Sequence, residues 1–346
     1  MNQILITGVT GAFGEYLIES FLRHEDVHLT LLVRGKSQEE AIARMGTYST
    51  NKRIEIFCAD LSRPNFDLNP ERYKDLQFRV TDVVHAAAST RFTHPLEEAR
   101  KRNVDTTRMI LEFVSGCTQL KRFGYVSSAL VAGKRTGLIL EDDFEHSQGF
   151  INSYEQSKYE AESLVRKAMR ENTIPTVIFR PPLVISKPRS DYQGPVNLLS
   201  HSLNLLKKDR LPLLPGTKES VFDIVDGTAT ADAIAVLMLK ETLRYTTYHL
   251  SNGARALTAG NMLRMLEEYL GRKIKTKFCG DMSTFKRKLL WEVIRRPWLR
   301  IVYKKTESYL PELAYPKTFD NKHLLEELNN DHFGPPPENV FRTILE

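Results

Sequence analysis

The sequence has few cysteines and no apolar run long enough to cross a bilayer. Its three cysteines, Cys58, Cys117 and Cys279, are odd in number and far apart, which fits neither a disulfide framework nor a metal-binding motif. Residues 233–239 form the longest clean apolar run beside a helix pattern, and it is much shorter than a transmembrane helix. The first strand pattern begins almost at Met1, leaving no room for a targeting peptide. We therefore expect a cytoplasmic protein with no integral membrane segment and no metal site.

Acidic residues are scarce in one segment near the C-terminal end. Residues 272–305 hold twelve Lys and Arg against two acids, a balance of +10, so the rest carries −4 of the net +6. Within it Phe285, Leu289, Val293 and Ile294 recur at helical spacing. Three interpretations stay open: a core-facing helix with a solvated cationic side, a docking face for a phosphorylated or acidic carrier, and transient membrane contact. Nucleic-acid binding is not expected, because no recognition motif accompanies the charge.

Strand and helix patterns alternate over the first 180 residues, which is typical of a parallel sheet with helices on both faces. Prolines and glycines then become frequent, and a short strand and a helix return over residues 223–240. We predict an α/β fold, a Rossmann-type doubly wound parallel sheet with an interleaved smaller C-terminal region. Expected strands cover residues 4–6, 29–33, 53–57, 82–86, 122–126, 176–179 and 247–250, and expected helices residues 13–23, 38–45, 96–114, 153–169 and 259–270.

Glycines stand at Gly8, Gly11 and Gly14 in ILITGVTGAFG, between the first strand and the first helix. Backbone N–H groups at a helix N-terminus are unpaired and the helix dipole favours an anion, so this turn suits a phosphate. A valine at Gly11 is expected to fill the pyrophosphate position and to oppose a positive φ. The order of strand, glycine turn and helix predicts a dinucleotide site.

Arg34 follows the second expected strand, where an NAD-specific fold usually places an acid for the ribose 2′-hydroxyl. A guanidinium cannot accept that hydrogen bond but suits a 2′-phosphate, so Arg34 predicts NADP(H). Asp60 and Leu61 follow the third strand and are expected near the adenine. Small side chains at residues 86–88 follow the fourth strand and would let the cofactor lie close against the strand ends. Close packing within the protein explains these alanines as well.

Tyr154 and Lys158 are four residues apart in NSYEQSKYEAE and therefore share one helix face. A nearby ammonium is expected to lower the pKa of the phenol, so that the pair passes a proton to a substrate oxygen. This pair follows the fifth strand, at the sheet edge where doubly wound folds bind ligands. Two other pairs with the same spacing are expected on the surface: Tyr48–Lys52 and Tyr269–Lys273.

Several motifs in order resemble the extended short-chain dehydrogenase/reductase superfamily: the glycine turn, HAAA, NVDTT, YVSS, YEQSK and RPPLV, with TFDNKHLLEELN and PPPENVF near the end. The resemblance covers essentially the whole chain and implies an NADP-dependent oxidoreductase. By position, Ser128 matches the family's catalytic Ser/Thr, with Ser127 as a weaker alternative. Tyr154 and Lys158 match its proton donor and helper. Asn103 matches the asparagine that supports them, although a purely structural role explains it nearly as well.

These motifs assign two sets of residues and two regions. The NADP-binding Rossmann domain is expected over residues 1–187 plus 221–250, and the substrate-binding region over 188–220 plus 251–346. The predicted catalytic residues are Ser128, Tyr154 and Lys158. The predicted cofactor-binding residues are Thr7, Gly8, Thr10, Gly11, Ala12, Phe13, Gly14, Arg34, Asp60, Leu61, Ala86, Ala87, Ala88, Asn103, Tyr154, Lys158, Pro181 and Val184.

The segment LLVRGKSQEEAIARM resembles the signature of the thioester-reductase and fatty acyl-CoA reductase (male sterility-type) branch, with Arg34 and Arg44 near the adenosine phosphate. This resemblance implies an NADPH-dependent reductase that transfers hydride to a carbonyl. Its favoured substrate is an acyl thioester, free on coenzyme A or carrier-bound, giving an aldehyde, with carrier docking at residues 272–305. The alternatives are a ketone, aldehyde or nucleotide-sugar reductase and a non-catalytic NADP sensor. A sugar epimerase is disfavoured, because such enzymes normally retain NAD, whereas Arg34 favours NADP.

Overall fold

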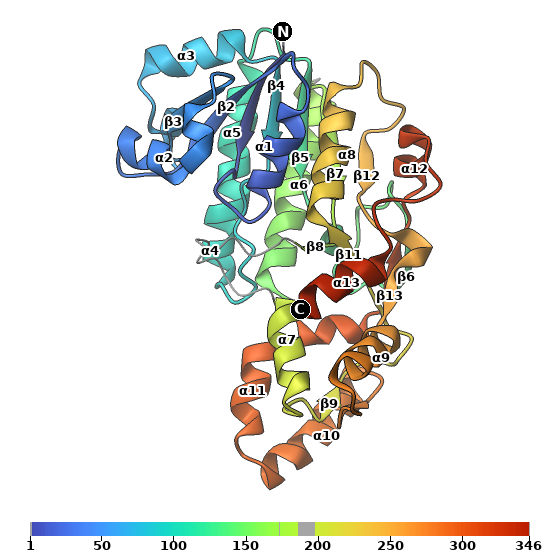
Figure 1. Ribbon diagram of the computed structural model, residues 1–346. Helices are drawn as coiled ribbons and strands as arrows, with labels where there is room; N and C mark the ends of the chain where they lie inside the picture. Colours follow the sequence, from blue (N-terminus) through green and yellow to red (C-terminus); the bar gives the residue numbers. More distant parts are fainter. Residues whose placement is uncertain (1, 173, 186–197, 346) are drawn as a thin grey trace.

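A seven-stranded parallel sheet forms the centre of the molecule in the computed structural model, which describes residues 2–172, 174–185 and 198–345 (Figure 1). In sheet order its strands are β12 (Thr247–His249), β7 (Thr176–Arg180), β5 (Arg122–Val126), β4 (Asp82–His85), β1 (Asn2–Thr7), β2 (Val27–Val33) and β3 (Ile54–Cys58). The chain moves outward from β1 in one direction and then in the other. This order confirms the predicted Rossmann-type doubly wound sheet.

Helices connect these strands and cover both faces of the sheet (Figure 1). They are α1 (Gly14–Leu22), α2 (Gln38–Arg44), α3 (Pro70–Arg79), α4 (Leu96–Arg100), α5 (Thr106–Ser115), α6 (Ser153–Asn172) and α8 (Gly227–Leu239). The later helices are α7 (Leu198–Lys207), α9 (Ala259–Leu270), α10 (Met282–Arg295), α11 (Leu299–Thr306), α12 (Lys322–Leu328) and α13 (Pro337–Leu345). Short 3₁₀ turns occur at η1 (Gly46–Thr50), η2 (Pro64–Asp67), η4 (Ala129–Ala132), η5 (Gly253–Arg255) and η6 (Leu310–Ala314).

Alternate side chains of β1 pack into two different helical layers. Ile4 and Ile6 belong to an apolar cluster with α1 and α8, whereas Leu5 belongs to a cluster with α5 and α6 on the opposite face. All three side chains are fully buried. A strand that is buried on both faces has consecutive apolar residues in its sequence. For this reason the sequence alone predicts the first strand.

The helix predicted over residues 96–114 is present but not regular, because a π-helical turn, η3 (Lys101–Asp105), lies between α4 and α5. The Thr107 hydroxyl donates to the carbonyl of Asn103 across 2.6 Å inside this wider turn. Apolar periodicity does not distinguish a helix with one wider turn from a regular helix. Such turns frequently occur at functional sites, and this one carries Asn103.

A second region, below the sheet in Figure 1, has its own apolar cluster. The cluster joins α7, α9, α10 and α11 through side chains such as Leu203, Leu266, Phe285 and Tyr303. Short strand pairs complete this region and its junction with the sheet: β8 (Leu183–Ile185) with β11 (Ile224–Asp226), β9 (Leu213–Leu214) with β14 (Lys277–Phe278), β10 (Val221–Phe222) with β13 (Leu257–Thr258), and β6 (Gly137–Ile139) with β15 (Lys317–Phe319). The α10–α11 hairpin lies at the end of the molecule opposite the N-terminus (Figure 1).

The C-terminal residues pack on both parts of the molecule. Leu324 of α12 and Phe333 belong to the cluster of α1 and α8, whereas Val340 and Phe341 of α13 belong to the cluster of the second region. The predicted division into two regions stays a prediction, and its boundary at residues 187/188 lies outside the described residues. In the described ranges no helix has the length and apolar character needed to cross a bilayer.

Candidate active site

The turn after β1 brings the backbone of Gly8 against the end of β4. Gly8 has φ +81°, and a Cβ there would lie 2.6 Å from the backbone of Ala86 and Ala87. A Cβ on Gly14 would lie 2.3 Å from the backbone of the turn, so α1 also starts in close contact with it. Gly11 does not have a positive φ, and its N–H donates to the Gly8 carbonyl across 3.0 Å. The expectation of a positive φ at Gly11 is wrong, because the backbone takes the left-handed conformation at Gly8.

Three backbone N–H groups of this turn, those of Thr10, Ala12 and Phe13, make no hydrogen bond within the described part of the chain. They immediately precede α1, whose N-cap residue Phe13 contributes no side-chain hydrogen bond. Unpaired N–H groups and the dipole at a helix N-terminus favour an anion. The glycines of this turn let the backbone segments approach closely, and its unpaired N–H groups are available to an anion. The turn therefore fits the pyrophosphate of a dinucleotide.

The Thr7 side chain holds the end of β1 against β4. Its Oγ1 lies 2.8 Å from Nδ1 of His85 and accepts a hydrogen bond from the N–H of Ala87 at 3.2 Å. Burial lowers the pKa of His85 to about 3, so the ring is neutral. Ala86 and Ala87 are half-buried and Ala88 is exposed. The end of β4 thus presents only small side chains beside the glycine turn.

Arg34 lies exposed at the end of β2, close enough to Asp60 to act on its charge. Burial alone would raise the pKa of Asp60, but hydrogen bonds from Ser62 and the charges of Arg34 and Arg63 lower it overall. The Arg34 guanidinium makes no hydrogen bond to any residue that the structure describes, which leaves it free for a ligand. Arg44 instead donates to the carbonyl of Arg34 and braces this loop.

The π-helical turn places the Asn103 amide between two segments. Its Oδ1 accepts the N–H of Ser89 at 2.7 Å, and its Nδ2 donates to the Ser89 carbonyl at 3.2 Å and to Ser157 Oγ at 2.9 Å. Ser157 lies on α6 between Tyr154 and Lys158. Asn103 therefore holds the loop after β4 against α6. Its contact with a cofactor stays a prediction.

Neighbouring serines at the end of β5 face opposite directions, as successive residues of extended chain do. Ser127 Oγ donates to Oε2 of Glu162 across 2.6 Å. Ser128 Oγ accepts the N–H of Leu130 at 3.2 Å, and the Ser128 hydroxyl lies close enough to the Tyr154 phenol to act on its pKa. The structure thus brings Ser128, and not Ser127, together with Tyr154.

Lys158 is buried one helical turn after Tyr154. Its Nζ donates to Oη of Tyr125 at 3.0 Å and to the carbonyl of Val126 at 2.8 Å. Burial lowers the pKa of Lys158 to about 7. Burial also raises the pKa of Tyr154, and the nearby Ser128 hydroxyl only partly offsets this. The expectation that the lysine lowers the pKa of the tyrosine is wrong here, because desolvation of the phenol dominates.

A fully buried ion pair lies beside these residues, and the sequence patterns did not predict it. Arg180 Nη2 donates to Oε1 of Glu162 across 2.6 Å. Burial would raise the pKa of Glu162, but the charge and hydrogen bonds of Arg180 lower it to about 2. The available signal was a glutamate four residues after Lys158, on the same face of α6. Nothing in the sequence indicates that this glutamate pairs with Arg180 at the end of β7.

An apolar cavity of about 150 Å³ lies between the sheet edge and the second region. On the sheet side it is lined by Phe92 and Leu130. Phe92 stacks on Tyr154, with ring centroids 5.1 Å apart, and Leu130 is the residue whose N–H bonds Ser128. The cavity therefore lies next to the Ser128–Tyr154 pair, and its wall there is made by the neighbours of these two residues. Much of the opposite wall comes from α7 and α9: Leu203, Leu206, Met262, Leu263 and Leu266.

Three other predicted cofactor-binding residues have contacts within the protein. Pro181 follows β7 and accepts the N–H of Ala129 at 2.8 Å. Val184 pairs with Val225 across β8 and β11. Leu61 follows β3 and packs at the margin of the α5–α6 cluster. Pro181 and Leu61 lie beyond the carboxyl ends of their strands, and cofactor contact by all three stays a prediction.

The two other Tyr–Lys pairs lie elsewhere. The Tyr48 phenol bonds Glu15 and Glu19 at 3.2 and 3.1 Å. Tyr269 is 53% exposed, and Lys273 forms an ion pair with a neighbouring acid. Spacing alone therefore did not identify the buried pair, whereas its position after β5 did.

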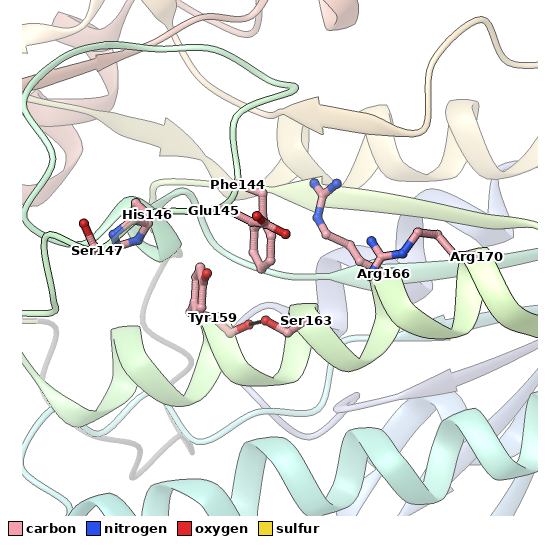
Figure 2. Close-up of a pocket in the computed structure, with 8 residues that line it drawn as sticks. All are labelled: Phe144, Glu145, His146, Ser147, Tyr159, Ser163, Arg166 and Arg170. Carbon is pink, nitrogen blue, oxygen red and sulfur yellow. Dashed lines mark hydrogen bonds between the residues drawn. The ribbon is translucent and has the colours of Figure 1, made fainter.

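A second and more open hollow, of about 520 Å³, lies on the outer face of α6 (Figure 2). Figure 2 shows the loop residues Phe144 and His146 facing Tyr159 on the helix. Phe144 stacks on Tyr159 at 4.5 Å, and Arg166 lies over the Phe144 ring. None of the predicted catalytic residues lines this hollow. Its contacts hold the loop to the helix.

Known proteins resemble this chain in sequence over its nucleotide-binding part. The NAD-binding family described as male sterility protein matches residues 6–234. A glycine betaine reductase of Emericella nidulans is 26% identical over 269 residues, covering 72% of this chain and 21% of that protein. A putative fatty acyl-CoA reductase of Drosophila melanogaster is 28% identical over 274 residues, covering 66% of this chain and 48% of that protein. The chain thus spans about a fifth and about half of these relatives.

A solved structure shares the fold over the full chain. The terminal R domain from the myxalamid PKS-NRPS biosynthetic pathway has a TM-score of 0.78 at 24% identity, covering 100% of this chain and 90% of that one. The family match includes the glycine turn, Ser128, Tyr154 and Lys158. The resemblance stated from the motifs is thereby confirmed. This chain belongs to the male sterility protein family of NAD(P)-binding domains, of the extended short-chain dehydrogenase/reductase type.

Proposed function

We propose that this chain is an NADPH-dependent reductase that converts an acyl thioester into an aldehyde. The observation that carries this proposal is the neighbouring pair of Ser128 and Tyr154 hydroxyls beside the apolar cavity. A hydroxyl pair suits the oxygen of a reacting carbonyl, and an apolar wall suits an acyl chain. The names of the relatives, a fatty acyl-CoA reductase among them, support the same reaction class.

One thioester, one NADPH and one proton give one aldehyde, one free thiol and NADP⁺. Bound NADPH supplies the hydride that reaches the carbonyl carbon. The hydroxyls of Ser128 and Tyr154 donate hydrogen bonds to the carbonyl oxygen, on which negative charge develops. The C–S bond then breaks as the carbonyl re-forms, giving the aldehyde and a leaving thiolate. Because burial raises the pKa of Tyr154, the phenol keeps its proton near neutral pH and acts as the acid that protonates this sulfur; the proton of the overall equation then restores the phenol. Lys158 has two of its three donors engaged, and the third orients the nicotinamide ribose.

The preference for NADPH over NADH rests on Arg34. Its guanidinium is exposed at the end of β2, where the 2′-phosphate of the adenosine ribose is expected. A planar guanidinium forms paired, charge-assisted hydrogen bonds with a phosphate. The unpaired N–H groups of Thr10, Ala12 and Phe13 supply the pyrophosphate contacts.

A coenzyme A thioester enters as a free ligand, whereas a carrier-bound thioester requires a docking surface. Carrier docking at residues 272–305 stays a prediction, as does a cytoplasmic location. The proposed chemistry depends on neither.

The deciding experiment incubates the purified protein with NADPH and a panel of acyl-CoA thioesters, aldehydes and ketones. NADPH oxidation, free thiol and trapped aldehyde are measured together. We expect thiol release in step with NADPH oxidation, abolished by Tyr154→Phe and unchanged by the matched control Tyr269→Phe. Oxidation of NADPH only with ketones or aldehydes, without thiol, would replace the thioester by those substrates. Tight NADPH binding with no turnover on any substrate would support a non-catalytic sensor.

A further inference from the structure

The α10–α11 hairpin exposes a cluster of large apolar side chains at the end of the molecule opposite the N-terminus (Figure 1). Its five members are 44–66% exposed and make up nearly half of the eleven exposed large apolar side chains in the described ranges. Both tryptophans of the chain are among them. This exposed apolar cluster consists of Leu290, Trp291, Ile294, Trp298 and Ile301.

The exposed apolar cluster lies on the side of α10 that the core does not use. Phe285 packs inward, and Tyr303 fixes the hairpin on β9 by accepting the N–H of Leu213 at 3.0 Å and donating to its carbonyl at 2.6 Å. At about 100° per residue, the three cluster members on α10 lie about 140–240° around the helix from Phe285. The predicted grouping of Ile294 with the core-facing residues is therefore wrong.

Eight exposed cations surround the exposed apolar cluster on the same hairpin. Among residues the structure describes, only Arg296 of these eight has a carboxylate within 4.0 Å, that of Glu292 at 3.8 Å. Within the described ranges, the other seven charges are not neutralised by an ion pair. The eight are Lys286, Arg287, Lys288, Arg295, Arg296, Arg300, Lys304 and Lys305.

We propose that this hairpin docks the protein onto an anionic lipid surface, with α10 and α11 lying in the plane of the interface. Indole side chains favour the boundary between headgroups and acyl chains, and Lys and Arg attract anionic headgroups. Helices of 14 and 8 residues lie on a bilayer and do not cross it. An acidic carrier protein would satisfy the cations but supplies no comparable reason for five exposed apolar side chains. The lipid surface accounts for both features.

Docking in this way would hold the apolar cavity next to the bilayer. Phe278 in β14 and Tyr309 after α11 flank the hairpin in sequence, and both line the cavity. The docking inference itself is independent of the reaction and of the substrate, because it rests on the hairpin surface alone.

The test mixes the full chain with vesicles of phosphatidylcholine, alone or with about one third phosphatidylglycerol. Both tryptophans lie in the exposed apolar cluster, so intrinsic tryptophan fluorescence reports on the hairpin directly. We expect a blue shift and co-sedimentation with the anionic vesicles, weakened by added salt, and neither with phosphatidylcholine alone. Absence of binding to the anionic vesicles, or equal, salt-insensitive binding to both, would overturn the proposal.

Two variants and a control assign the binding to the hairpin. The double variant Trp291→Ser, Ile294→Ser should abolish co-sedimentation, and the double variant Arg295→Gln, Arg300→Gln should weaken it at least tenfold, about fivefold per cation. Phe78→Ser, at a 64% exposed position on α3, should bind as the unaltered protein does. All variants should retain NADPH binding. If the hairpin variants sediment like the control, or if an acidic carrier protein binds the hairpin while vesicles do not, lipid docking is wrong.

Discussion

Ser127 donates its hydroxyl hydrogen bond to Glu162 across 2.6 Å, whereas the next residue, Ser128, faces the opposite side of the strand end, toward Tyr154. Glu162 is held in turn by Arg180, and all three members of this network are buried. A buried structural network and the proposed catalytic pair thus occupy opposite sides of one strand end. A change in the network should therefore affect both stability and activity.

Tyr154→Phe should lower turnover by about a hundredfold to ten-thousandfold while leaving folding and NADPH affinity nearly unchanged. The change removes one hydroxyl and keeps the ring that stacks on Phe92. Lys158→Met should lower turnover and also weaken NADPH binding, because the ammonium is assigned to the ribose. Steady-state kinetics and calorimetric titration check both, with Tyr269→Phe as the control. Full activity in Tyr154→Phe would make this tyrosine a packing residue only.

Arg34→Asp should shrink or invert the preference for NADPH over NADH. A charge-assisted hydrogen bond to a phosphate contributes about 1.5–3 kcal/mol, or about ten- to a hundredfold in affinity. Dissociation constants for both cofactors measure the effect. Arg63→Gln is the matched control, because Arg63 also acts on Asp60 but follows β3. Equal affinities for the two cofactors in the unaltered protein would refute the assignment.

Gly8→Ala should reduce both the unfolding free energy and NADPH affinity, because the new Cβ would meet the backbone of Ala86 at 2.6 Å. Gly137→Ala separates the clash from the backbone strain, since Gly137 has φ +84° and nothing within 4 Å of its Cβ position. Denaturant unfolding should show a larger loss for Gly8→Ala than for Gly137→Ala. Similar losses would mean that strain alone, and not the close approach, sets the cost.

Glu162→Gln should destabilise the protein at neutral pH by about 3–5 kcal/mol, because it leaves Arg180 buried without its partner. Folding lowers the pKa of Glu162 from 4.5 to about 2, so its stabilisation is complete above pH 4.5 and is lost as the pH falls toward 2. The stability gap between variant and unaltered protein should close over that range. Glu160→Gln, which opens the partly exposed pair with Arg100, should show a smaller gap at neutral pH. A gap that does not change with pH would contradict the depressed pKa.

Leu263→Trp should lower kcat/KM for long acyl thioesters more than tenfold and leave the shortest ones nearly unchanged. The larger side chain fills part of the apolar cavity, and each acyl CH₂ excluded from an apolar site loses about 0.8 kcal/mol. Leu140→Trp, at an exposed position outside the cavity wall, is the control. A uniform loss over all chain lengths would show that the acyl group does not occupy this cavity.

Local sequence patterns were sufficient to predict those features that depend only on residues close together in the chain. The apolar run of β1, the glycine turn and the face shared by Tyr154 and Lys158 depend on neighbours within a few residues. Chain order then placed these parts at one sheet edge, because right-handed connections between parallel strands leave few alternatives. The predicted fold and the resemblance were confirmed on that basis.

Contacts between distant segments decided the rest. The pairing of Glu162 with Arg180, the direction of Ser128 and the raised pKa of Tyr154 all depend on burial by other strands and helices. The same holds for the exposed side of α10: the spacing of Phe285 and Ile294 predicts a helix but does not specify which of its faces meets the core. Burial determines how far the pKa of an ionisable group shifts and which face of a helix packs against the core. Because burial arises only when distant segments pack together, a local sequence pattern does not specify it.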